Sequence, residues 1–396
     1  MAKFRTRYNV IRRLMSLCLL AALISCLYMC GSGGSPGGAS SSSTQAGDPG
    51  NSGTQTGSTG GSASSTPVPD GPSGSSAGGS NGGTSTTTPA GFPSSDHVFV
   101  IMLENQGFSQ VFPSGGATNC SSSGMPYLCS LAAVNGVALH FYANAHGSLL
   151  DYLFATSGAD WKGKPYDCSG SACSSAGVIK GDNIVRALNK ASKTWRGYFE
   201  GMPQCGYTGG SAGNYTQHHN PFKWYSDVAG SLNQQDNMCP FTQLAVDLNT
   251  NTLPNFGYIV PNLRDDAEGT GSQSASALLS AADNWIKTNI KPLLSSGPFQ
   301  AGGDGILIVT FDEARVKGKS GDKSSDNSCS PSQSSGCGGH VAFVMIGPNV
   351  VAGSTTSNTY HFQDMLHTII HLLGISDYMN GANGAADIAL LPGAGE

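Results

Sequence analysis

The chain has 396 residues, a length that suggests two or three domains. It contains 55 glycines, and only 11% of its residues are charged, against about 25% in an average soluble protein. Five of its 20 basic residues lie within the first 13 positions, and without them 15 basic residues face 25 acidic ones. This acidic balance argues against a nucleic-acid-binding protein, which needs a basic face for the phosphates.

The N-terminus has the pattern of an export signal. Basic residues within positions 3–13 precede an apolar run at 14–25, which is short for a membrane span. The sequence LISC at 23–26 resembles a bacterial lipobox, in which the cysteine is acylated and begins the mature protein. We therefore expect a lipoprotein-type signal peptide over 1–26, with Cys30 as a second candidate for the anchor. An ordinary signal peptide is the alternative. The protein would be exported and membrane-anchored, at the cell surface or in the periplasm, or else secreted.

The next segment, 27–94, is dominated by Gly, Ser, Thr and Pro and contains only two charged residues, Asp48 and Asp70. It cannot bury enough apolar surface to offset its chain entropy, so we expect a disordered linker. Behind a lipid anchor, such a linker would hold a folded domain, residues 95–396, away from the membrane.

Eight of the 11 cysteines lie in this domain, and an even number in an exported protein predicts disulfides. Proximity in sequence suggests the pairs Cys120–Cys129, Cys168–Cys173, Cys205–Cys239 and Cys329–Cys337. The spacing alone leaves the connectivity open. No C-x-x-C pair occurs, which argues against a structural zinc site built on such pairs.

Short, nearly uncharged apolar runs alternate with helical patterns along the domain. The predicted strands are 97–103, 256–260, 305–311 and 341–346. The predicted helices are 125–134, 148–156, 183–190, 241–248 and 361–373. This alternation predicts an α/β domain with a central, mostly parallel sheet and helices on both faces.

Two of the predicted strands end in polar pairs. Glu104 and Asn105 follow the first strand, and Asp312 and Glu313 follow the strand at 305–311. Ligands of open α/β sheets bind beyond the carboxyl ends of the strands. Three carboxylates and a carboxamide at that edge would suit a divalent metal ion of unknown identity.

Ser148 begins a predicted helix within the sequence AHGSLLDYLFATSG. The helix N-terminus favours an anion and a serine alkoxide, so Ser148 is a candidate nucleophile for phosphoryl transfer. An N-cap serine is the commoner role for such a residue.

Three further histidines stand out. His340 follows a glycine pair at the start of a predicted strand, and it is either a ligand or phosphate donor or a partly exposed loop residue. His367 and His371 lie one turn apart in the last predicted helix, a spacing that can bind metal. The sequence presents no third ligand for them, which favours ordinary helix residues.

Six segments in this order resemble the bacterial phosphoesterase family of acid phosphatases and phospholipases C, which is related to the alkaline phosphatase superfamily. They are HVFVIMLENQGFSQV, AHGSLLDYLFATSG, HHNPFKWYSDV, PNFGYIVPNLRDDAEG, ILIVTFDEA and GGHVAFVMIGP, and the resemblance runs from about His97 to Gly374. It implies an alkaline phosphatase-like fold and metal-assisted hydrolysis of a phosphate ester through a phosphoserine.

The resemblance assigns roles by position. Ser148 matches the nucleophile, and His340 matches a histidine after a glycine pair. His146 and His219 fall on motif positions that could contact the phosphate or protonate the leaving group. The four metal-ligand positions are those of Glu104, Asn105, Asp312 and Glu313.

The sequence departs from the family pattern at four places. Asp151 replaces an Asn, and a carboxylate there would repel phosphate unless it is protonated or bound to metal. The family sequence Asp-Asp-Ala-His ends here in Glu268, so Asp266 and Glu268 are only possible site residues. Gln106 replaces a histidine. Phe362 replaces a second family histidine, and the neighbouring His361 is the candidate to take the place of that histidine.

These patterns predict an exported, metal-dependent hydrolase of phosphate mono- or diesters. The alternative is a surface lipoprotein that kept the fold, lost catalysis and acts as a binding module, and the departures at Asp151, Glu268 and Phe362 favour it. A serine hydrolase of another type is a third hypothesis. Its G-x-S-x-G match at 209–213 is not preceded by an apolar strand, so the usual structural context is missing.

Overall fold

The computed structural model describes residues 91–161, 177–315 and 337–394. The predicted signal peptide, the anchor at Cys26 or Cys30 and most of the linker lie outside these residues. Within the described residues, no helix combines the length and the apolar character needed to cross a membrane.

One eight-stranded sheet, in the order β4-β3-β5-β1-β6-β7-β2-β8, forms the centre of the fold. Its strands are β1 (Val98–Leu103), β2 (Gly136–Ala143), β3 (Trp195–Phe199), β4 (Met238–Pro240), β5 (Phe256–Val260), β6 (Ile306–Phe311), β7 (Gly339–Ile346) and β8 (Ser354–Tyr360). All neighbouring strands pair in parallel except that β7 is antiparallel to both β6 and β2. The predicted mostly parallel α/β sheet is therefore confirmed, with β7 as its exception.

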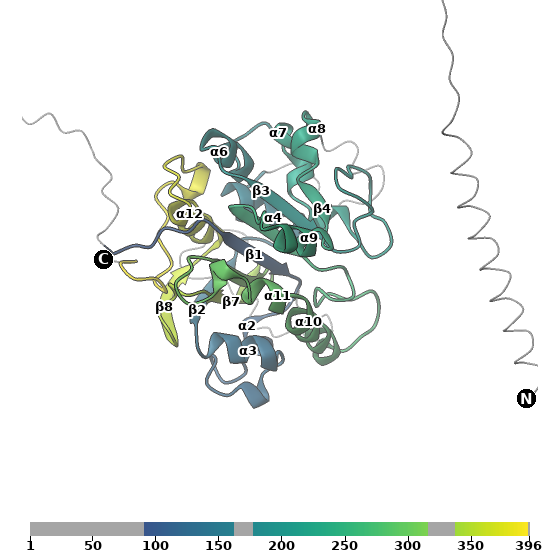
Figure 1. The fold of residues 1–396 in the computed structure, drawn as a ribbon. Coiled ribbons are helices and arrows are strands. Elements are labelled where there is room, and N and C mark those ends of the chain that lie inside the picture. Colours follow the sequence, from purple (N-terminus) through teal and green to yellow (C-terminus); the bar gives the residue numbers. More distant parts are fainter. Residues whose placement is uncertain (1–90, 162–176, 316–336, 395–396) are drawn as a thin grey trace, which may run out of the picture. The chain divides into compact units, whose positions relative to one another are not determined.

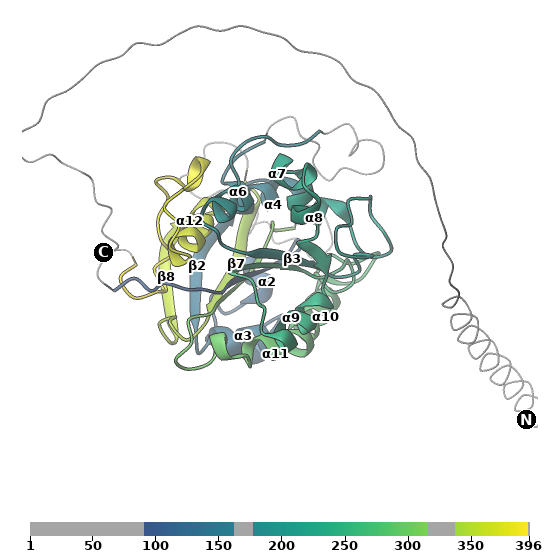
Figure 2. The same ribbon diagram turned by 45° about the horizontal axis from the view of Figure 1, so that its top comes forward.

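Helices cover both faces of the sheet. Figure 2 shows α4 (Ser148–Ser157), α6 (Ile184–Lys190) and α12 (Phe362–Leu372) on one side, and α3 (Pro126–Ala132), α9 (Gln243–Thr250) and α10 (Ala275–Asn289) on the other. The shorter helices are α2 (Phe108–Val111), α7 (Ser226–Ala229), α8 (Leu232–Gln235) and α11 (Lys291–Leu294). Single 3₁₀ turns occur at Cys120–Ser122, Gln217–His219, Phe222–Trp224, Gly297–Phe299 and Asn380–Ala382.

The central strands form as predicted because their side chains are apolar on both faces. Every residue of β1, β5 and β6 is buried, which is the usual environment of a parallel strand between two helical layers. The strands outside the predicted set lie away from this centre. The edge strand β8 reads STTSNTY and buries only two of its seven residues, so it carries no apolar signal.

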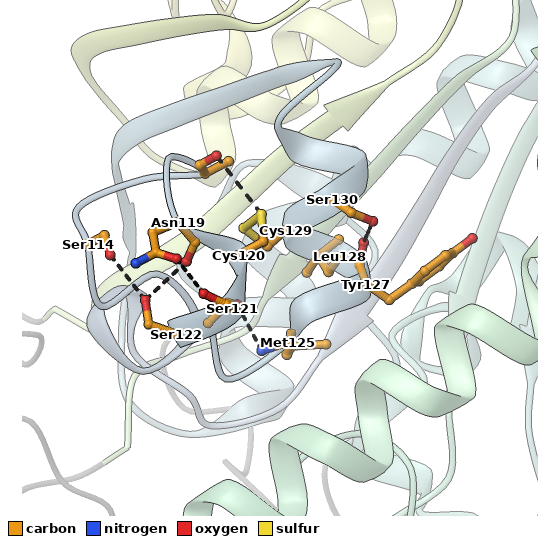
Figure 3. Close-up of a disulfide and its surroundings, with 12 residues drawn as sticks. Ser114, Asn119, Cys120, Ser121, Ser122, Met125, Tyr127, Leu128, Cys129 and Ser130 are labelled. Atoms are coloured by element: carbon orange, nitrogen blue, oxygen red, sulfur yellow. Dashed lines mark hydrogen bonds between the residues drawn. A yellow bond between two sulfur atoms is a disulfide. The ribbon is translucent and has the colours of Figure 1, made fainter.

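Two of the predicted disulfides are present, Cys120–Cys129 and Cys205–Cys239. Figure 3 shows the first joining the turn at Asn119–Ser122 to α3, next to Tyr127 and Leu128. Its closure fixes the start of α3, where Asp283 of α10 accepts hydrogen bonds from the backbone of Tyr127 and Leu128, both at 2.9 Å. Cys168, Cys173 and Cys329 lie outside the described residues.

Gly257 allows β5 to lie against β1. A Cβ at this position would lie 2.3 Å from the ring of Phe99, its register partner, which is fully buried against Tyr198 and Phe299. We expect Gly257→Ala to lower the free energy of unfolding by about 1–3 kcal/mol in urea denaturation, because overpacking displaces buried aromatic rings. Gly297→Ala is the matched control, since its Cβ meets nothing within 4 Å. Equal stability of the two variants would contradict the prediction.

Candidate active site

The strand β1, labelled near the middle of the fold in Figure 1, ends beside the carboxyl end of its parallel neighbour β6. The two strands pair in register from Val98 with Ile306 to Leu103 with Phe311, so the residues that follow them are neighbours. The backbone amide of Asp312 donates to the carbonyl of Leu103 at 2.9 Å, which continues this pairing past the strand ends. The structure thus brings Glu104 and Asp312 to one place, as the sequence predicted.

Glu104 is fully buried and accepts hydrogen bonds from two side chains of α4. The Ser148 hydroxyl donates to Oε2 at 2.9 Å, and the Tyr152 hydroxyl donates to Oε1 at 2.5 Å. The sequence analysis missed Tyr152. Its position four residues after Ser148 was the available signal, because that spacing places both side chains on one face of a helix.

Ser148 is the first residue of α4, and the chain turns sharply before it. Gly147 has φ = +112° and ψ = 104°, a conformation that only glycine adopts readily. The turn is held from inside the helix, because Asp151 Oδ1 accepts the backbone amides of Asn144 and Ala145, each at 3.0 Å. The acid that departs from the family pattern therefore anchors the loop that presents Ser148.

Asn105 and Asp312 are joined across the strand ends. The Asn105 backbone amide donates to Asp312 Oδ1 at 3.0 Å, and Asn105 takes a left-handed φ of +52°. Its side-chain amide donates to Glu104 Oε2 at 3.2 Å. Asp312 Oδ2 is buried and, among the described residues, has no hydrogen-bond partner.

Glu313 faces the loop before α4 with both oxygens engaged. Oε1 accepts the Gly147 backbone amide at 3.1 Å, and Oε2 pairs with Nδ1 of His146. His146 is more open than Glu313, with 34% of its side chain exposed against 5%. The structure brings Glu313 to the predicted site, but its carboxylate contacts residues 146 and 147 of the loop before Ser148, the serine loop.

His219 lies on the other side of Glu104. Its ring stacks on Tyr152 with a centroid distance of 5.4 Å and an interplanar angle of 4°. Nε2 lies 3.3 Å from Glu104 Oε1 and 3.9 Å from Glu268 Oε2, and Nδ1 lies 3.7 Å from Asp266 Oδ2. Neither ring nitrogen makes a hydrogen bond within the described part of the chain, and burial holds the pKa of His219 well below its usual value.

The loop after β5 completes this side of the site. The Glu104 backbone amide donates to the carbonyl of Asp266 at 2.7 Å, and Asp266 Oδ1 accepts the Glu268 amide at 2.8 Å. Gln106, another departure from the family pattern, is buried and donates to the carbonyl of Ala267 at 2.8 Å. The predicted possible site residues Asp266 and Glu268 therefore adjoin Glu104.

His340 and His361 lie at the rim, on β7 and at the start of α12. Because β7 is antiparallel, its first residues lie at the edge where the parallel strands end. There the His340 ring stacks on Phe108 and Tyr142, and its Nε2 meets the carbonyl of Leu139 at 2.7 Å. The His361 ring lies 6.3 Å from Tyr142, and its Nδ1 is 3.9 Å from the Asp364 carboxylate. The described contacts join neither ring to the buried acids.

The neighbouring Phe362 is fully buried and packs edge-on against Phe141. It therefore belongs to the core beneath the rim. A histidine at this position would bury a polar ring in apolar surroundings.

Among the described residues, no Lys or Arg forms an ion pair with the buried acids of the site. Burial raises the pKa of Glu104, Asp151, Asp266 and Asp312 well above the usual values, and neighbouring carboxylates raise each further. A buried carboxylate is stable only when it is paired, hydrogen-bonded or bound to a cation. The described part of the site supplies hydroxyl and amide donors but no Lys or Arg within ion-pair distance of Glu104 or Asp312.

The site fits a divalent cation. Glu104, His219 and Glu268 each offer a ligand atom, and these atoms lie within 4.8 Å of one another. Asp312 Oδ2 and both His219 nitrogens are buried polar atoms without a hydrogen-bond partner among the described residues. Oxygen and imidazole donors together suit a hard or borderline metal ion.

The chain belongs to a known family. The model of the Phosphoesterase family matches residues 118–376, more than half of the chain and including Ser148 and Asp312. The predicted family is therefore confirmed, and with it the class, an enzyme that hydrolyses phosphate ester bonds.

Individual relatives are more distant. A phosphatidylinositol-3-phosphatase from Mycobacterium tuberculosis is 26% identical over 306 residues, covering 76% of this chain and 84% of that protein. A probable acid phosphatase from Kluyveromyces lactis is 26% identical over 227 residues, and the match covers 56% of this chain and 48% of that protein. A solved structure from Vibrio parahaemolyticus, described as in the alkaline phosphatase superfamily, is 14% identical with a TM-score of 0.49, covering 74% of this chain and 71% of that one.

The raised carboxyl pKa values predict how the metal-free protein responds to pH. Unfolded carboxyls ionise near about pH 4, whereas the buried ones keep their protons to higher pH, so the folded state binds more protons. In excess chelator, the free energy of unfolding should therefore fall as the pH rises from about 4 through the raised folded pKa values.

Urea denaturation across this pH range measures the effect. The double variant Glu104→Gln with Asp312→Asn should flatten the pH dependence, since two of the titrating groups are gone. If the free energy of unfolding of the metal-free wild type falls with pH no more steeply than that of the double variant, the assignment is wrong.

Proposed function

We propose that this protein is an exported, metal-dependent phosphoesterase that hydrolyses its substrate through a phosphoserine at Ser148. The observation that carries the proposal is the position of the Ser148 hydroxyl. It lies at the N-terminus of a ten-residue buried helix, 2.9 Å from the fully buried Glu104 carboxylate, whose cluster offers ligand atoms for a cation.

The metal ligands in this proposal are centred on Glu104. Asp312, with its unpartnered Oδ2, and Asn105, whose side-chain amide donates to Glu104 Oε2, lie on one side, and His219 and Glu268 lie on the other. Glu313, predicted as a ligand, is better suited to positioning, because both of its oxygens already hold His146 and Gly147. When bound, a divalent ion would neutralise the acids and polarise the phosphoryl group.

The chain's own groups account for positioning and proton transfer. Glu104 Oε2 accepts the hydrogen bond of the Ser148 hydroxyl, which fixes the Ser148 Oγ atom at the helix N-terminus. The positive end of the α4 dipole at this first turn favours the negative charge of the phosphate. The Asp151 contacts to Asn144 and Ala145 keep this turn rigid, so the substitution at 151 supports the nucleophile without facing the phosphate as a bare charge.

His146 is the proposed acid for the leaving group. Glu313 holds its Nδ1, which leaves Nε2 as the ring nitrogen that can carry a proton to the departing oxygen. His340, at the same edge of the sheet, remains a candidate for contact with the substrate, and His361 is a more remote one.

The substrate and location remain part of the proposal. The relatives named phosphatidylinositol-3-phosphatase and acid phosphatase favour a phosphate monoester, and phosphodiesters are the second class to test. The predicted lipid anchor at Cys26 and the linker 27–94 would place the domain near a membrane, within reach of phosphate esters at its surface.

Ser148→Ala tests the nucleophile. In the purified protein, we expect it to lower kcat on p-nitrophenyl phosphate by at least about 1,000-fold, since the covalent step is lost. Asp312→Asn and excess chelator should each abolish turnover as well. Added divalent metal should restore the turnover of the chelated wild type but not that of Asp312→Asn. Ser130→Ala, which removes an exposed serine on α3, is the matched control and should leave kcat unchanged.

Two results would overturn the proposal. Wild-type turnover that survives Ser148→Ala would remove the phosphoserine. A folded, metal-loaded wild type that turns over neither a monoester nor a diester would favour the alternative of a binding module.

His146→Ala tests the leaving-group acid. We expect a loss of about 100-fold or more in kcat on an alkyl phosphate, whose leaving group needs a proton, and a much smaller loss on p-nitrophenyl phosphate. His97→Ala is the control, because His97 precedes β1 at the opposite edge of the sheet. Equal losses on both substrates would show that His146 acts on binding or folding instead.

A further inference from the structure

A second cluster of ligand atoms lies along α12 and the segment that follows it. His367 and His371 are one turn apart on this helix, with ring centroids 6.3 Å apart. The sequence alone offered no third ligand, but the fold brings Asp387 between them. One atom from each of the three residues lies within 4.8 Å of the other two.

The individual atoms are arranged as a metal site requires. His371 Nδ1 lies 2.8 Å from Asp387 Oδ2, and His367 Nε2 lies 3.8 Å from Asp387 Oδ1. Ligand atoms around a tetrahedral zinc ion are about 3.4 Å apart, given metal–ligand bonds of about 2.1 Å. The two separations from Asp387, 2.8 and 3.8 Å, lie on either side of this value, so side-chain adjustment could bring the atoms onto such an ion.

One of the histidines is already in the correct tautomer. The His367 Nδ1 atom lies 2.9 Å from the carbonyl of Ala382, to which it can only donate. The lone pair is therefore on Nε2, the atom that faces Asp387. A ligand histidine whose other nitrogen donates to a carbonyl is the usual arrangement at protein zinc sites.

The surroundings hold all three residues in place. The His371 ring stacks on Phe92 with a centroid distance of 3.9 Å, and the His367 ring stacks on Tyr378 at 4.4 Å. The backbone on both sides of Asp387 is tied to α12, because Ala386 N donates to Asp364 Oδ1 and Ile388 N donates to Thr368 Oγ1, each at 3.0 Å. The cluster is thus preorganised by contacts that do not involve the ligand atoms.

A simple hydrogen bond between His371 and Asp387 does not account for the whole cluster. It uses Oδ2 only, and Oδ1 is buried without a hydrogen-bond partner among the described residues. A metal ion would satisfy Oδ1 and His367 Nε2 together.

We propose that His367, His371 and Asp387 bind a divalent transition metal, zinc foremost, at a site separate from the proposed active site. Two imidazole nitrogens and one carboxylate suit zinc, whereas calcium and magnesium prefer oxygen ligands throughout. The site joins α12 to the chain's last described segment and, through Phe92, to the point where the chain enters the domain. Its role is therefore structural, whereas the proposed active-site residues come from the ends of β1 and β6, from α4, from the 3₁₀ turn at Gln217–His219 and from the loop after β5.

The experiment compares zinc content and zinc-dependent stability of the full-length protein. After equilibration with zinc and gel filtration, the double variant His367→Gln with His371→Gln should hold one equivalent less than the wild type. Micromolar zinc added to chelator-treated protein should raise the Tm of the wild type more than that of the double variant. His140→Gln, which removes an exposed histidine of β2, is the matched control and should behave as the wild type.

Asp387→Asn is the second variant, in case the double variant does not fold. It keeps the shape of the side chain and should weaken zinc binding at least about 10-fold through loss of the ligand charge. Cobalt in place of zinc gives an independent readout, since the visible absorption of tetrahedral cobalt should be present in Ser148→Ala with Asp312→Asn and diminished when Asp387→Asn is added.

The proposal fails if wild type, Asp387→Asn and the histidine variants bind equal zinc with equal Tm shifts. Phosphatase activity is measured separately on the same samples, so this failure is distinct from failure of the proposed catalytic function.

Discussion

The in-register parallel pairing of β1 with β6 is the constraint on which the site depends. Because Leu103 lies opposite Phe311, the next residues, Glu104 and Asp312, leave the sheet side by side. Both strands are wholly buried, and the Glu104 and Asp312 side chains that directly follow them are buried as well. A shift of one residue in this pairing would turn the alternate side chains to the other face of the sheet and separate the two acids.

The cost of burying these acids explains the organisation around them. Ser148 and Tyr152 donate hydroxyl hydrogen bonds to Glu104, and backbone amides at the strand ends donate to Asp312. Asp151 accepts two amides of the loop before α4. These donors reduce the desolvation penalty but leave the net charge, since none of them is a cation. The same residues therefore position the serine and line the proposed metal site.

The departures from the family pattern are accommodated by local contacts. Asp151 holds the serine loop, Gln106 binds the carbonyl of Ala267, and Phe362 fills the core against Phe141. Glu268 stands within 3.9 Å of His219, where it adds a ligand atom beside Glu104. Glu268 also adds a like charge, which raises the pKa of Glu104 and Asp266.

The sequence by itself determined the central sheet, the helix that begins at Ser148 and the two acidic strand ends, because fully buried strands and a helix start have strong local signals. It also supplied the family resemblance, through six ordered segments. Only the tertiary structure decided the direction of β7, the contact of Tyr152 with Glu104, the engagement of Glu313 with His146, and the third ligand beside His367 and His371. Each of these contacts joins chain segments that are far apart in sequence but pack together in the fold. Local sequence patterns carry no information about which distant side chain completes a site.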